Sequence, residues 1–391
     1  MPVAQDERVF SVGARLSHTV LTNGQLLEMG IDGLFDIWSE SRAGSLTNPP
    51  RQGDETVFGA PPGAAVGNDL WHPALGNIAP YALAELHLGD FELRPGLRLD
   101  GSLVSSDRVL PPSGLLPRAG FTRTAWSAEP RMAASFAVVP WLSFGAAGGI
   151  HHQLPDPADL SPVFGSSSLG PSRAVDGVFS VSAQARSFRL ESAGFLRQLD
   201  DLPVRNPTRN PPPGSALVQL GRGRAFGAQL LLRRECAERG LCAMLAYTLS
   251  RSERRGPADP VWRLSDYDQT HVLTLSLGYR RRNASMGARL CYATGLPRTP
   301  VVGAVFDTQA GIFRPVLGAQ NSMRLASFVE LDLHAERSWR WRTVTFALDL
   351  DIVNASDHAN AEEIVYSGDF SRHDYVHGLP LLVLAGFRLE I

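Results

Sequence analysis

The sequence contains no lysine, only three cysteines and few charged residues. All 37 residues of the lysine and arginine class are arginine, and charged residues make up 19% of the chain, against roughly 25% of an average soluble protein. The formal net charge is -2. This balance excludes a strongly basic nucleic-acid-binding surface, so no nucleic-acid partner is expected.

The sequence also lacks a long apolar run and a targeting signal. No stretch of about 18 apolar residues occurs, which excludes a transmembrane helix. Residues 1–8 do not show the charged-then-apolar pattern of a secretory signal. We therefore expect that a signal has been removed, or that the chain is one part of something longer.

Glycine and proline, in contrast, are abundant. The chain has 37 glycines and 28 prolines among 391 residues, a composition typical of many short strands joined by turns and loops. No shift in composition divides the sequence, so residues 1–391 are predicted to form a single domain.

The clearest strand pattern lies within residues 266–300. Apolar side chains alternate with small or polar ones from Leu273 to Tyr279, a period of two that only a strand can use. A polar turn follows at residues 281–285, the next run alternates again, and a long connection begins after Gly295. A hairpin with one apolar face, a short turn at one end and a long loop at the other is typical of a transmembrane β-barrel.

The same pattern recurs in pairs along the whole chain. A strand-like run at 10–17 turns at Asn23-Gly24 into a second run at 27–37, and a last run covers 379–391. The other predicted hairpins pair 81–87 with 91–100, 132–139 with 142–150, 175–186 with 188–202, 224–234 with 241–250, 273–279 with the run after 285, and 328–337 with 343–354. The predicted fold is an all-β, antiparallel transmembrane barrel with about 15–16 strands in this chain.

The predicted connections alternate between short and long. Short turns are expected at 21–25, 88–91, 140–141, 187, 236–241, 281–285 and 338–342, and long loops at 42–79, 104–129, 153–173, 205–217, 252–269, 296–326 and 355–378. Barrels of the bacterial outer membrane have short periplasmic turns and long extracellular loops. Trp141, Trp339 and Trp341 all fall at short turns, which predicts an aromatic girdle at the periplasmic interface.

Counting the strands gives about fifteen, whereas bacterial single-chain barrels have an even number. If the last strand descends toward the periplasm, the first one does too, and an ascending strand before residue 8 is missing. We expect the chain to be the C-terminal portion of a larger barrel. The alternative is a closed barrel with an odd number of strands and one parallel seam.

Several segments, taken in order, resemble the β-barrel of a TonB-dependent outer-membrane receptor. They are Leu93-Arg94-Pro95-Gly96-Leu97-Arg98-Leu99-Asp100, Leu160-Ser161-Pro162-Val163-Phe164-Gly165, Arg224-Ala225-Phe226-Gly227, Tyr247-Thr248-Leu249-Ser250-Arg251-Ser252, Asp266-Tyr267-Asp268-Gln269-Thr270-His271, Thr294-Gly295-Leu296-Pro297, Leu331-Asp332-Leu333, Asp351-Ile352-Val353-Asn354-Ala355 and Gly378-Leu379-Pro380. The resemblance implies a barrel of 22 strands, so about seven strands and the family's N-terminal plug are absent here. It also implies an inner-membrane energy-transducing complex as a partner.

The predicted site residues are polar positions of the last strands. Alternation places Glu330, Asp332, Glu336, Asp349, Asp351 and Arg388 on the face toward the lumen. We expect these carboxylates to pair with lumen arginines or with a plug rather than to form a catalytic dyad.

No catalytic, metal or cofactor site is predicted. His151 and His152 are adjacent in a strand and so point to opposite faces, which makes one shared metal ion improbable. The loops contain no nucleophile-elbow pattern. The chain is therefore not expected to be an enzyme.

The cysteines suggest one disulfide bond. Cys236 and Cys242 flank a predicted hairpin turn and lie close enough to form a bridge in an oxidising periplasm. Two unpaired thiols are an equally compatible outcome. Cys291 lies in a predicted strand without an evident partner.

The resemblance implies the barrel of an energy-dependent importer in the outer membrane of a Gram-negative bacterium. Its solute would be scarce and bulky, such as a metal chelate, a vitamin or a glycan. The alternatives are a plugless diffusion pore, a structural barrel subunit of an outer-membrane complex, and a soluble β-rich protein. Expected partners are outer-membrane lipid, the solute, and a chain that carries a plug or completes the barrel.

Overall fold

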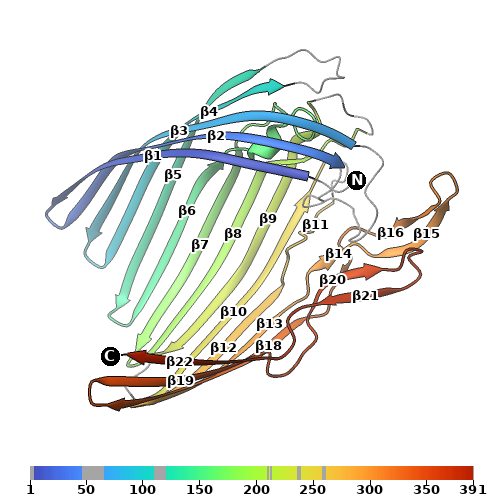
Figure 1. The fold of residues 1–391 in the computed structure, drawn as a ribbon. Coiled ribbons are helices and arrows are strands. Elements are labelled where there is room, and N and C mark those ends of the chain that lie inside the picture. The colour runs from blue at the N-terminus through green and yellow to red at the C-terminus, as the bar shows by residue number, and fades with distance from the viewer. Residues whose placement is uncertain are drawn as a thin grey trace.

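The computed structural model describes residues 4–45, 66–109, 120–208, 211, 214–235, 239–257 and 261–390. Fifteen strands follow one another in a single antiparallel sheet that curves around a hollow (Figure 1). They are β1 (Ala4–Thr22), β2 (Gln25–Ser45), β3 (Val66–Leu88), β4 (Phe91–Val109), β5 (Phe121–Val139), β6 (Leu142–Gln153), β7 (Ser172–Ala185), β8 (Phe188–Arg205), β9 (Leu217–Arg234), β10 (Gly240–Arg255), β12 (His271–Arg281), β13 (Ala284–Ala293), β18 (Phe328–Trp341), β19 (Val344–Val353) and β22 (Leu382–Glu390). The expected count of about fifteen strands is confirmed.

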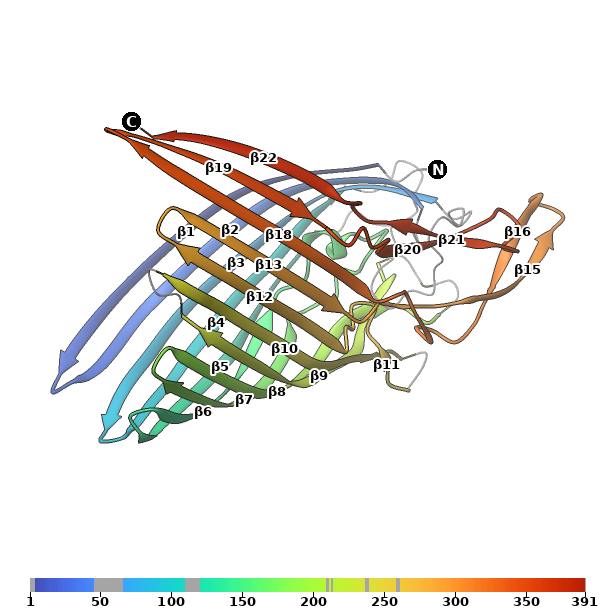
Figure 2. The ribbon, with the colours of Figure 1, turned by 90° about the horizontal axis from the view of Figure 1, so that it is seen from below.

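The sheet is a wall with two free edges. Each of the fifteen strands is hydrogen-bonded to the next one in the order given above, from β1 to β22. Among the described residues, no ladder joins β1 to β22. These two strands lie at opposite margins of the curved sheet in Figure 1. Figure 2 shows the same wall from below. The seam that would close a barrel of fifteen strands is therefore not formed by the described residues.

The described short turns lie at one end of the wall, and the described long connections lie at the other (Figure 1). The long connections carry their own short elements: the 3-10 helix η1 (Pro157–Leu160), β11 (Arg263–Leu264), and the pairs β14 (Pro297–Arg298) with β17 (Met323–Arg324), β15 (Val301–Asp307) with β16 (Ile312–Leu317), and β20 (Ala361–Tyr366) with β21 (His373–His377). The predicted alternation of turns and loops is confirmed.

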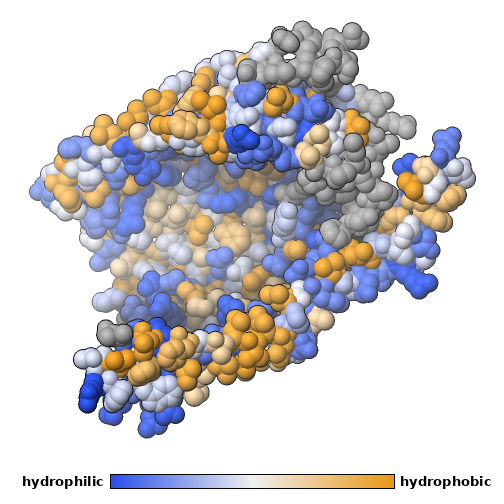
Figure 3. Space-filling model, in the orientation of Figure 1, coloured by the Kyte–Doolittle hydropathy of each residue, from blue (hydrophilic) through white to orange (hydrophobic). Residues whose placement is uncertain are grey.

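Each long strand has an apolar outer face and a more polar inner face. Leu245 of β10 lies opposite Leu232 of β9 and Leu275 of β12, so one apolar row runs around the outside. Directly paired residues of neighbouring strands share a face. At the last strands Leu350 lies opposite Ala335 and Ala385 on the outer face, whereas Asp349 lies opposite Glu336 and Gly386 on the inner face. Figure 3 looks into the hollow, where hydrophilic and intermediate surface predominates.

Two predicted loops are much shorter than expected because the strands extend well past their apolar segments. The loop expected at 42–79 is replaced over much of its length by β3, which begins at Val66. β3 contains Pro73 and Pro80, but the ladder to β2 skips Pro73 and the ladder to β4 skips Pro80. Each proline therefore lacks a ladder partner on one side only, which a strand tolerates. The expected loop at 104–129 likewise shortens, since β4 ends at Val109 and β5 begins at Phe121.

The turn predicted across Trp339-Arg340-Trp341 is wrong. These residues belong to β18, and the turn is formed by Arg342 and Thr343. Arg342 has a φ of 55°, the left-handed conformation that the first central residue of a tight hairpin turn requires. The observed turn thus begins at the last residue of the segment 338–342 in which it was predicted.

No helix among the described residues is long and apolar enough to cross a membrane.

Gly30 of β2 lies under the ring of its cross-strand partner Tyr81. A Cβ atom at Gly30 would lie 2.7 Å from the Leu16 carbonyl oxygen and equally close to the Tyr81 ring. We expect Gly30→Ala to destabilise the wall by about 1–3 kcal/mol, the usual cost of overpacking, measured by thermal unfolding in detergent micelles. The matched control is Gly33→Ala in the same strand, where the nearest atom is 4.0 Å away; equal losses in both variants would contradict the prediction.

Candidate functional site

The connection between β6 and β7, residues 154–171, folds into a compact segment that we call the inner loop. Asp156 caps η1, since its Oδ1 accepts a hydrogen bond of 2.9 Å from the Ala158 amide. Ser161 then ends η1, and its hydroxyl accepts from the amides of Val163 and Phe164 at 3.1 and 3.0 Å. The loop therefore holds its own shape through short-range hydrogen bonds.

Polar contacts fix the inner loop to the wall. The Trp71 indole of β3 donates to the Pro157 carbonyl at 3.0 Å, and the Ser161 hydroxyl donates to Asp69 Oδ2 at 2.6 Å. Arg123 of β5 donates to the carbonyls of Ser168 and Leu169, both at 2.8 Å. Gln219 of β9 exchanges two hydrogen bonds with the Gly170 backbone.

An apolar cluster also holds the inner loop against the wall. Its fully or nearly fully buried members come from the wall and from the loop: Leu75, Val104, Leu160, Leu169 and Leu217. Leu75 lies directly opposite Asp36 of β2 and Val104 of β4, so these wall residues belong to the inner face. The inner loop thus occupies the concave side of the sheet, near the end with the long connections (Figure 1).

Below the inner loop, ion pairs cross the inner face of β1 to β4. Asp32 of β2 accepts from Arg15 of β1 at 2.6 Å and from Arg98 of β4 at 2.5 Å. Arg98 also reaches Asp100 at 2.9 Å. The inner face at these strands is therefore a neutralised polar surface rather than a row of bare charges.

The predicted lumen residues of the last strands form a second set of pairs. Asp332 lies 2.6 Å from Arg289 of β13, and Glu330 lies 3.8 Å from the same guanidinium. Asp351 contacts His334 at 2.6 Å. These carboxylates thus contact basic side chains of the wall, and their role in a lumen stays a prediction.

Glu336 and Arg388 pair across an intervening strand. The Arg388 guanidinium of β22 reaches Glu336 of β18 at 3.2 Å, across β19. Asp349 of β19 lies opposite Glu336 on one side and Gly386 on the other. Gly386 leaves space for the Asp349 carboxylate, because a Cβ atom at this position would lie 2.3 Å from it.

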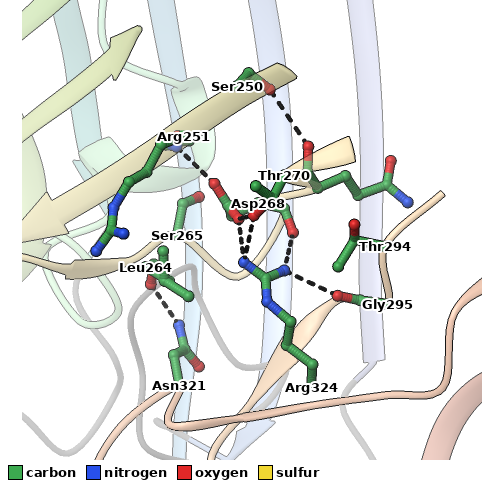
Figure 4. A network of polar contacts seen from close by, with 12 residues as sticks. Ser250, Arg251, Leu264, Ser265, Asp268, Thr270, Thr294, Gly295, Asn321 and Arg324 are labelled. Atoms are coloured by element: carbon green, nitrogen blue, oxygen red, sulfur yellow. Dashed lines mark hydrogen bonds and ion pairs between the residues drawn. The ribbon is translucent and has the colours of Figure 1, made fainter. Parts of the chain in front are cut away.

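A buried aspartate joins two long connections to the wall, and sequence analysis did not assign it a role. Asp268 is 1% exposed and pairs with Arg324 at 2.5 Å. The Arg324 guanidinium also donates to the carbonyls of Asp268 and Gly295 and to the Thr270 hydroxyl, at 2.9, 3.0 and 2.9 Å (Figure 4). Asp268 accepts in addition from the Ser252 amide of β10 at 2.6 Å. We call this network the loop latch.

The loop latch explains two of the quoted sequence segments. Asp268 and Thr270 belong to Asp266-Tyr267-Asp268-Gln269-Thr270-His271, and Gly295 belongs to Thr294-Gly295-Leu296-Pro297. A further hydrogen bond joins Asn321 to the Asp266 carboxylate at 2.6 Å. No sequence signal pointed to Arg324 or Asn321, because both lie in a long connection without a recognisable pattern.

The histidines and cysteines show no shared site in the described residues. His151 contacts Asp176 at 3.0 Å and His152 contacts Glu129 at 3.4 Å, so the two rings have different partners. Cys291 is free. Cys242 lies in β10, whereas Cys236 lies outside the described residues, so the disulfide bond between them stays a prediction.

One other group of side chains could in principle hold a metal ion. Glu85, His87 and Glu92 have ligand atoms within 4.8 Å of one another. Arg94 already occupies this group, since its guanidinium lies 3.0 Å from Glu85 and 2.5 Å from Glu92. A second cation would have to displace the arginine.

The three tryptophans of the predicted girdle lie at the end with the short turns. Trp141 is part of the turn between β5 and β6, and Trp339 is paired with Phe346 on the outer face. Trp141, Trp339 and Trp341 are 56%, 41% and 67% exposed. Their position at a membrane interface stays a prediction.

Glu40 is a buried acid beside the inner loop and lies beyond the apolar part of β2. Outward-facing apolar residues end at Ile37, and Ser39 and Ser41 follow. Glu40 is 1% exposed and pairs with Trp71 and Glu7 in the two ladders. Burial, with the nearby carboxylates of Glu7 and Asp156, raises the pKa of Glu40 to about 7, although a hydrogen bond from Gln5 opposes the shift.

The raised pKa predicts a pH-dependent inner loop. A carboxyl group with a raised pKa in the folded state stabilises that state while it is protonated, and this contribution is lost as the pH rises from about 4.5 through about 7. We expect backbone amides of residues 154–171 to lose about tenfold or more of their protection against hydrogen exchange between pH 5 and pH 8, since one pKa unit corresponds to ~1.4 kcal/mol.

Glu40→Gln is the matched variant for this experiment, because glutamine keeps the shape and removes the charge. Protection corrected for intrinsic exchange should then be nearly independent of pH. A wild-type loop whose corrected protection does not change with pH would contradict the prediction.

Comparison with solved structures gives the fold of this wall. The chain aligns over 99% of its length with the ferric-catecholate import receptor Fiu from E. coli at a TM-score of 0.64 and 16% identity. It aligns over 100% with the copper transporter OprC at 0.67 and 15% identity, and over 99% with the ferric citrate transporter FecA at 0.68 and 13% identity. The chain has the barrel fold of the TonB-dependent receptors.

The alignment covers somewhat more than half of each neighbour's own chain, namely 55% of Fiu, 57% of OprC and 55% of FecA. No protein-family model and no curated protein matches its sequence. The solved structures that share this fold are transporters and receptors of the outer membrane rather than enzymes.

Proposed function

We propose that this chain forms most of the wall of a transport barrel in the outer membrane of a Gram-negative bacterium and that a scarce, bulky solute passes along its inner face. The observation that carries the proposal is the two-sided wall, with an apolar row such as Leu232, Leu245 and Leu275 outside and paired charges inside. Lipid favours the first surface and a water-filled lumen the second.

The names of the neighbours support the proposed solute class. The named neighbours import or bind ferric catecholate, ferric citrate and copper, which favours a metal-bound solute over a vitamin or a glycan. In this chain the inner loop and the loop latch stand at the end with the long connections, where a solute would enter from outside.

The proposal requires further strands beyond those described, because the edges at β1 and β22 are unpaired among the described residues. We propose that a plug-bearing or barrel-completing polypeptide pairs with both edges, and that an inner-membrane energy-transducing complex acts on the plug. Mass spectrometry of the complex purified from native outer membranes, without denaturation, should identify this polypeptide. Recovery of the chain from cells without detergent would contradict a membrane-embedded wall.

The main alternative is a plugless diffusion pore, in which the inner loop alone narrows the lumen. Conductance in a planar lipid bilayer separates the two functions. A receptor whose lumen holds a plug should be nearly closed, whereas a pore narrowed only by residues 154–171 should show steady, large conductance. Steady open channels from the natively purified complex would favour the pore.

A further inference from the structure

Two acidic residues face each other at the free edge of the wall, at the end with the long connections. Glu7 of β1 lies directly opposite Glu40 of β2 on the inner face, and we call this pair the edge acids. Like charges at directly opposed positions destabilise a sheet. Burial raises the pKa of Glu40, and the carboxylates of Glu7 and Asp156 raise it further. Within the described part of the chain, neither edge acid forms an ion pair.

Glu40 is enclosed on every side except that of β1. Its side chain is 1% exposed, and its Oε2 atom accepts no hydrogen bond from the described residues. The fully buried Trp71 lies opposite it on β3, and η1 contacts β2 and β3 from the lumen side. Arg42, the next inner residue of β2, lies over the Phe164 ring, with its guanidinium carbon 4.3 Å from the ring centroid. A cation for Glu40 therefore has to come from the free edge.

The β1 edge is open along its whole length. All 19 residues of β1 are exposed, and the outward side chains of Phe10 and Leu16 are 64% and 73% exposed. One row of backbone amide and carbonyl groups points away from β2 and has no ladder partner among the described residues. Open sheet edges do not occur in the hydrocarbon region of a membrane. A further strand therefore covers β1, a step that rests on the proposed function.

The direction of the edge strands excludes a second copy of this chain as the source of that strand. β1 and β22 both run from the end with the long connections to the end with the short turns (Figure 1). The ladders at both edges of the wall are antiparallel, so the strand that continues the pattern next to β1 runs the opposite way. A second copy with the same orientation in the membrane offers no such edge. The occupant is a strand of a different polypeptide.

Arginines of this wall reach carboxylates across an intervening strand. Arg98 of β4 contacts Asp32 of β2 at 2.5 Å, across β3. Arg388 of β22 contacts Glu336 of β18 at 3.2 Å, across β19. An arginine on the incoming strand at the level of the edge acids stands in the same relation to the buried acid, with β1 between them. Its planar guanidinium fork is suited to contact both carboxylates.

We propose that the barrel-completing polypeptide pairs with β1 through a strand that carries an arginine or lysine opposite Glu7, and that this cation forms an ion pair with the edge acids. The ion pair fixes the register of the seam. A shift by one residue would turn the cation to the outer face, away from both acids. Such a cation favours the ionised form of Glu40, so the pH dependence expected for the inner loop applies to the chain without this strand.

The first test is the variant Glu7→Arg in the complex purified natively from outer membranes. The new side chain would neutralise Glu40, so the chain keeps its fold, but it would repel the incoming cation. We expect the fraction of this chain that retains the second polypeptide, measured by native mass spectrometry, to fall about tenfold or more. Retention equal to that of the wild type would overturn the proposal.

Asp6→Arg is the matched control. It makes the same change of charge one residue away, on the outer face of the same strand. Asp6 contacts Arg8 at 3.6 Å, and the two side chains are 70% and 82% exposed. An exposed pair of this kind contributes little, so retention of the second polypeptide should equal that of the wild type. An equal loss in both variants would also overturn the proposal, because it would show a general effect of charge.

A cross-link tests the position of the cation. Phe10 is replaced by photoreactive p-benzoylphenylalanine, which points outward from β1 toward the neighbouring strand. Glu7 and Phe10 are three positions apart, so in an antiparallel ladder the residue opposite Glu7 follows the residue opposite Phe10 by three positions. Tandem mass spectrometry of the cross-linked peptide should therefore find an arginine or lysine about three residues after the point of attachment.

Three outcomes of the cross-link would contradict the proposal: an acidic or uncharged residue at that position, attachment to a second copy of this chain, or attachment to lipid alone. A stoichiometric metal ion that is lost in Glu7→Gln would do the same, because the edge acids would then bind a metal and not a side chain. Recovery of the wild-type chain without detergent would instead contradict the proposed function. A membrane-embedded complex whose cross-linked strand lacks the cation contradicts only this inference.

Discussion

Replacing Arg324 with alanine should release the two long connections that the loop latch holds. Asp268 would remain buried at 1% exposure without its charge partner. Removing one partner of a buried ion pair costs about 3–5 kcal/mol. We expect faster hydrogen exchange of the amides of residues 263–270 and 294–326. The free energy of local opening of these residues should fall by about 3–5 kcal/mol.

Arg314→Ala is the matched control, because it removes the same type of pair from the neighbouring β15–β16 hairpin. Its contact with Asp307 is 2.7 Å long, but the two side chains are 57% and 25% exposed. An exposed pair contributes about 0–1 kcal/mol, so this variant should exchange almost like the wild type. Similar losses in both variants would show that burial of Asp268 is not the cause.

A second variant separates the buried charge from lost packing. In Asp268→Asn/Arg324→Ala the aspartate charge is removed together with its partner, so part of the lost protection should return. The double variant could instead exchange its amide hydrogens as fast as Arg324→Ala does. In that case the loop latch acts through the hydrogen bonds of Arg324 to the Gly295 and Asp268 carbonyls rather than through charge.

Gly165→Ala should displace the inner loop from the wall. A Cβ atom at Gly165 would lie 1.9 Å from the Asp159 carbonyl oxygen, which accepts a hydrogen bond of 2.7 Å from the Ser166 amide. The carbonyl oxygen is a backbone atom and the Cβ position is fixed by the backbone, so the clash cannot be relieved by a rotamer change. Overpacking costs about 1–3 kcal/mol at ordinary sites, and we expect at least the upper value here.

The readout is hydrogen exchange of residues 154–171, which should become faster when the inner loop leaves the wall. Gly170→Ala serves as the control, since the nearest atom to its Cβ would be Gln219 Oε1 at 3.6 Å, an ordinary contact. Unchanged protection in Gly165→Ala would mean that the inner loop does not depend on this close backbone approach.

The sequence predicted the two faces of each strand, the number of strands in the wall and the alternation of turns with loops. All three depend on the period of two within a single segment and on the turn residues next to it, such as Asn23-Gly24. Strand ends were predicted less well. β3 continues to Val66 because ladder pairing with its neighbours, and not its own apolar pattern, decides where a strand ends.

The candidate site was predicted only in part. Asp332 and Glu336 could be placed on the inner face by alternation, but their partners Arg289 and Arg388 depend on which strands are neighbours. The segment around Asp268 was recognised through a resemblance, without an indication that Asp268 is buried. The inner loop was predicted as a loop and nothing more.

What the sequence by itself determined is local: which side chains of a strand point to the same face, and where the chain turns. The tertiary structure alone decided that Trp71 meets Pro157, 86 residues away, that Ser161 meets Asp69 across 92 residues, and that Asp268 meets Arg324 across 56. These pairs have no sequence period, because the arrangement of whole strands and loops, and not a local spacing, brings them together. Arg222 of β9 and Arg255 of β10 belong to the same class, since their position opposite each other depends on the register of the two strands.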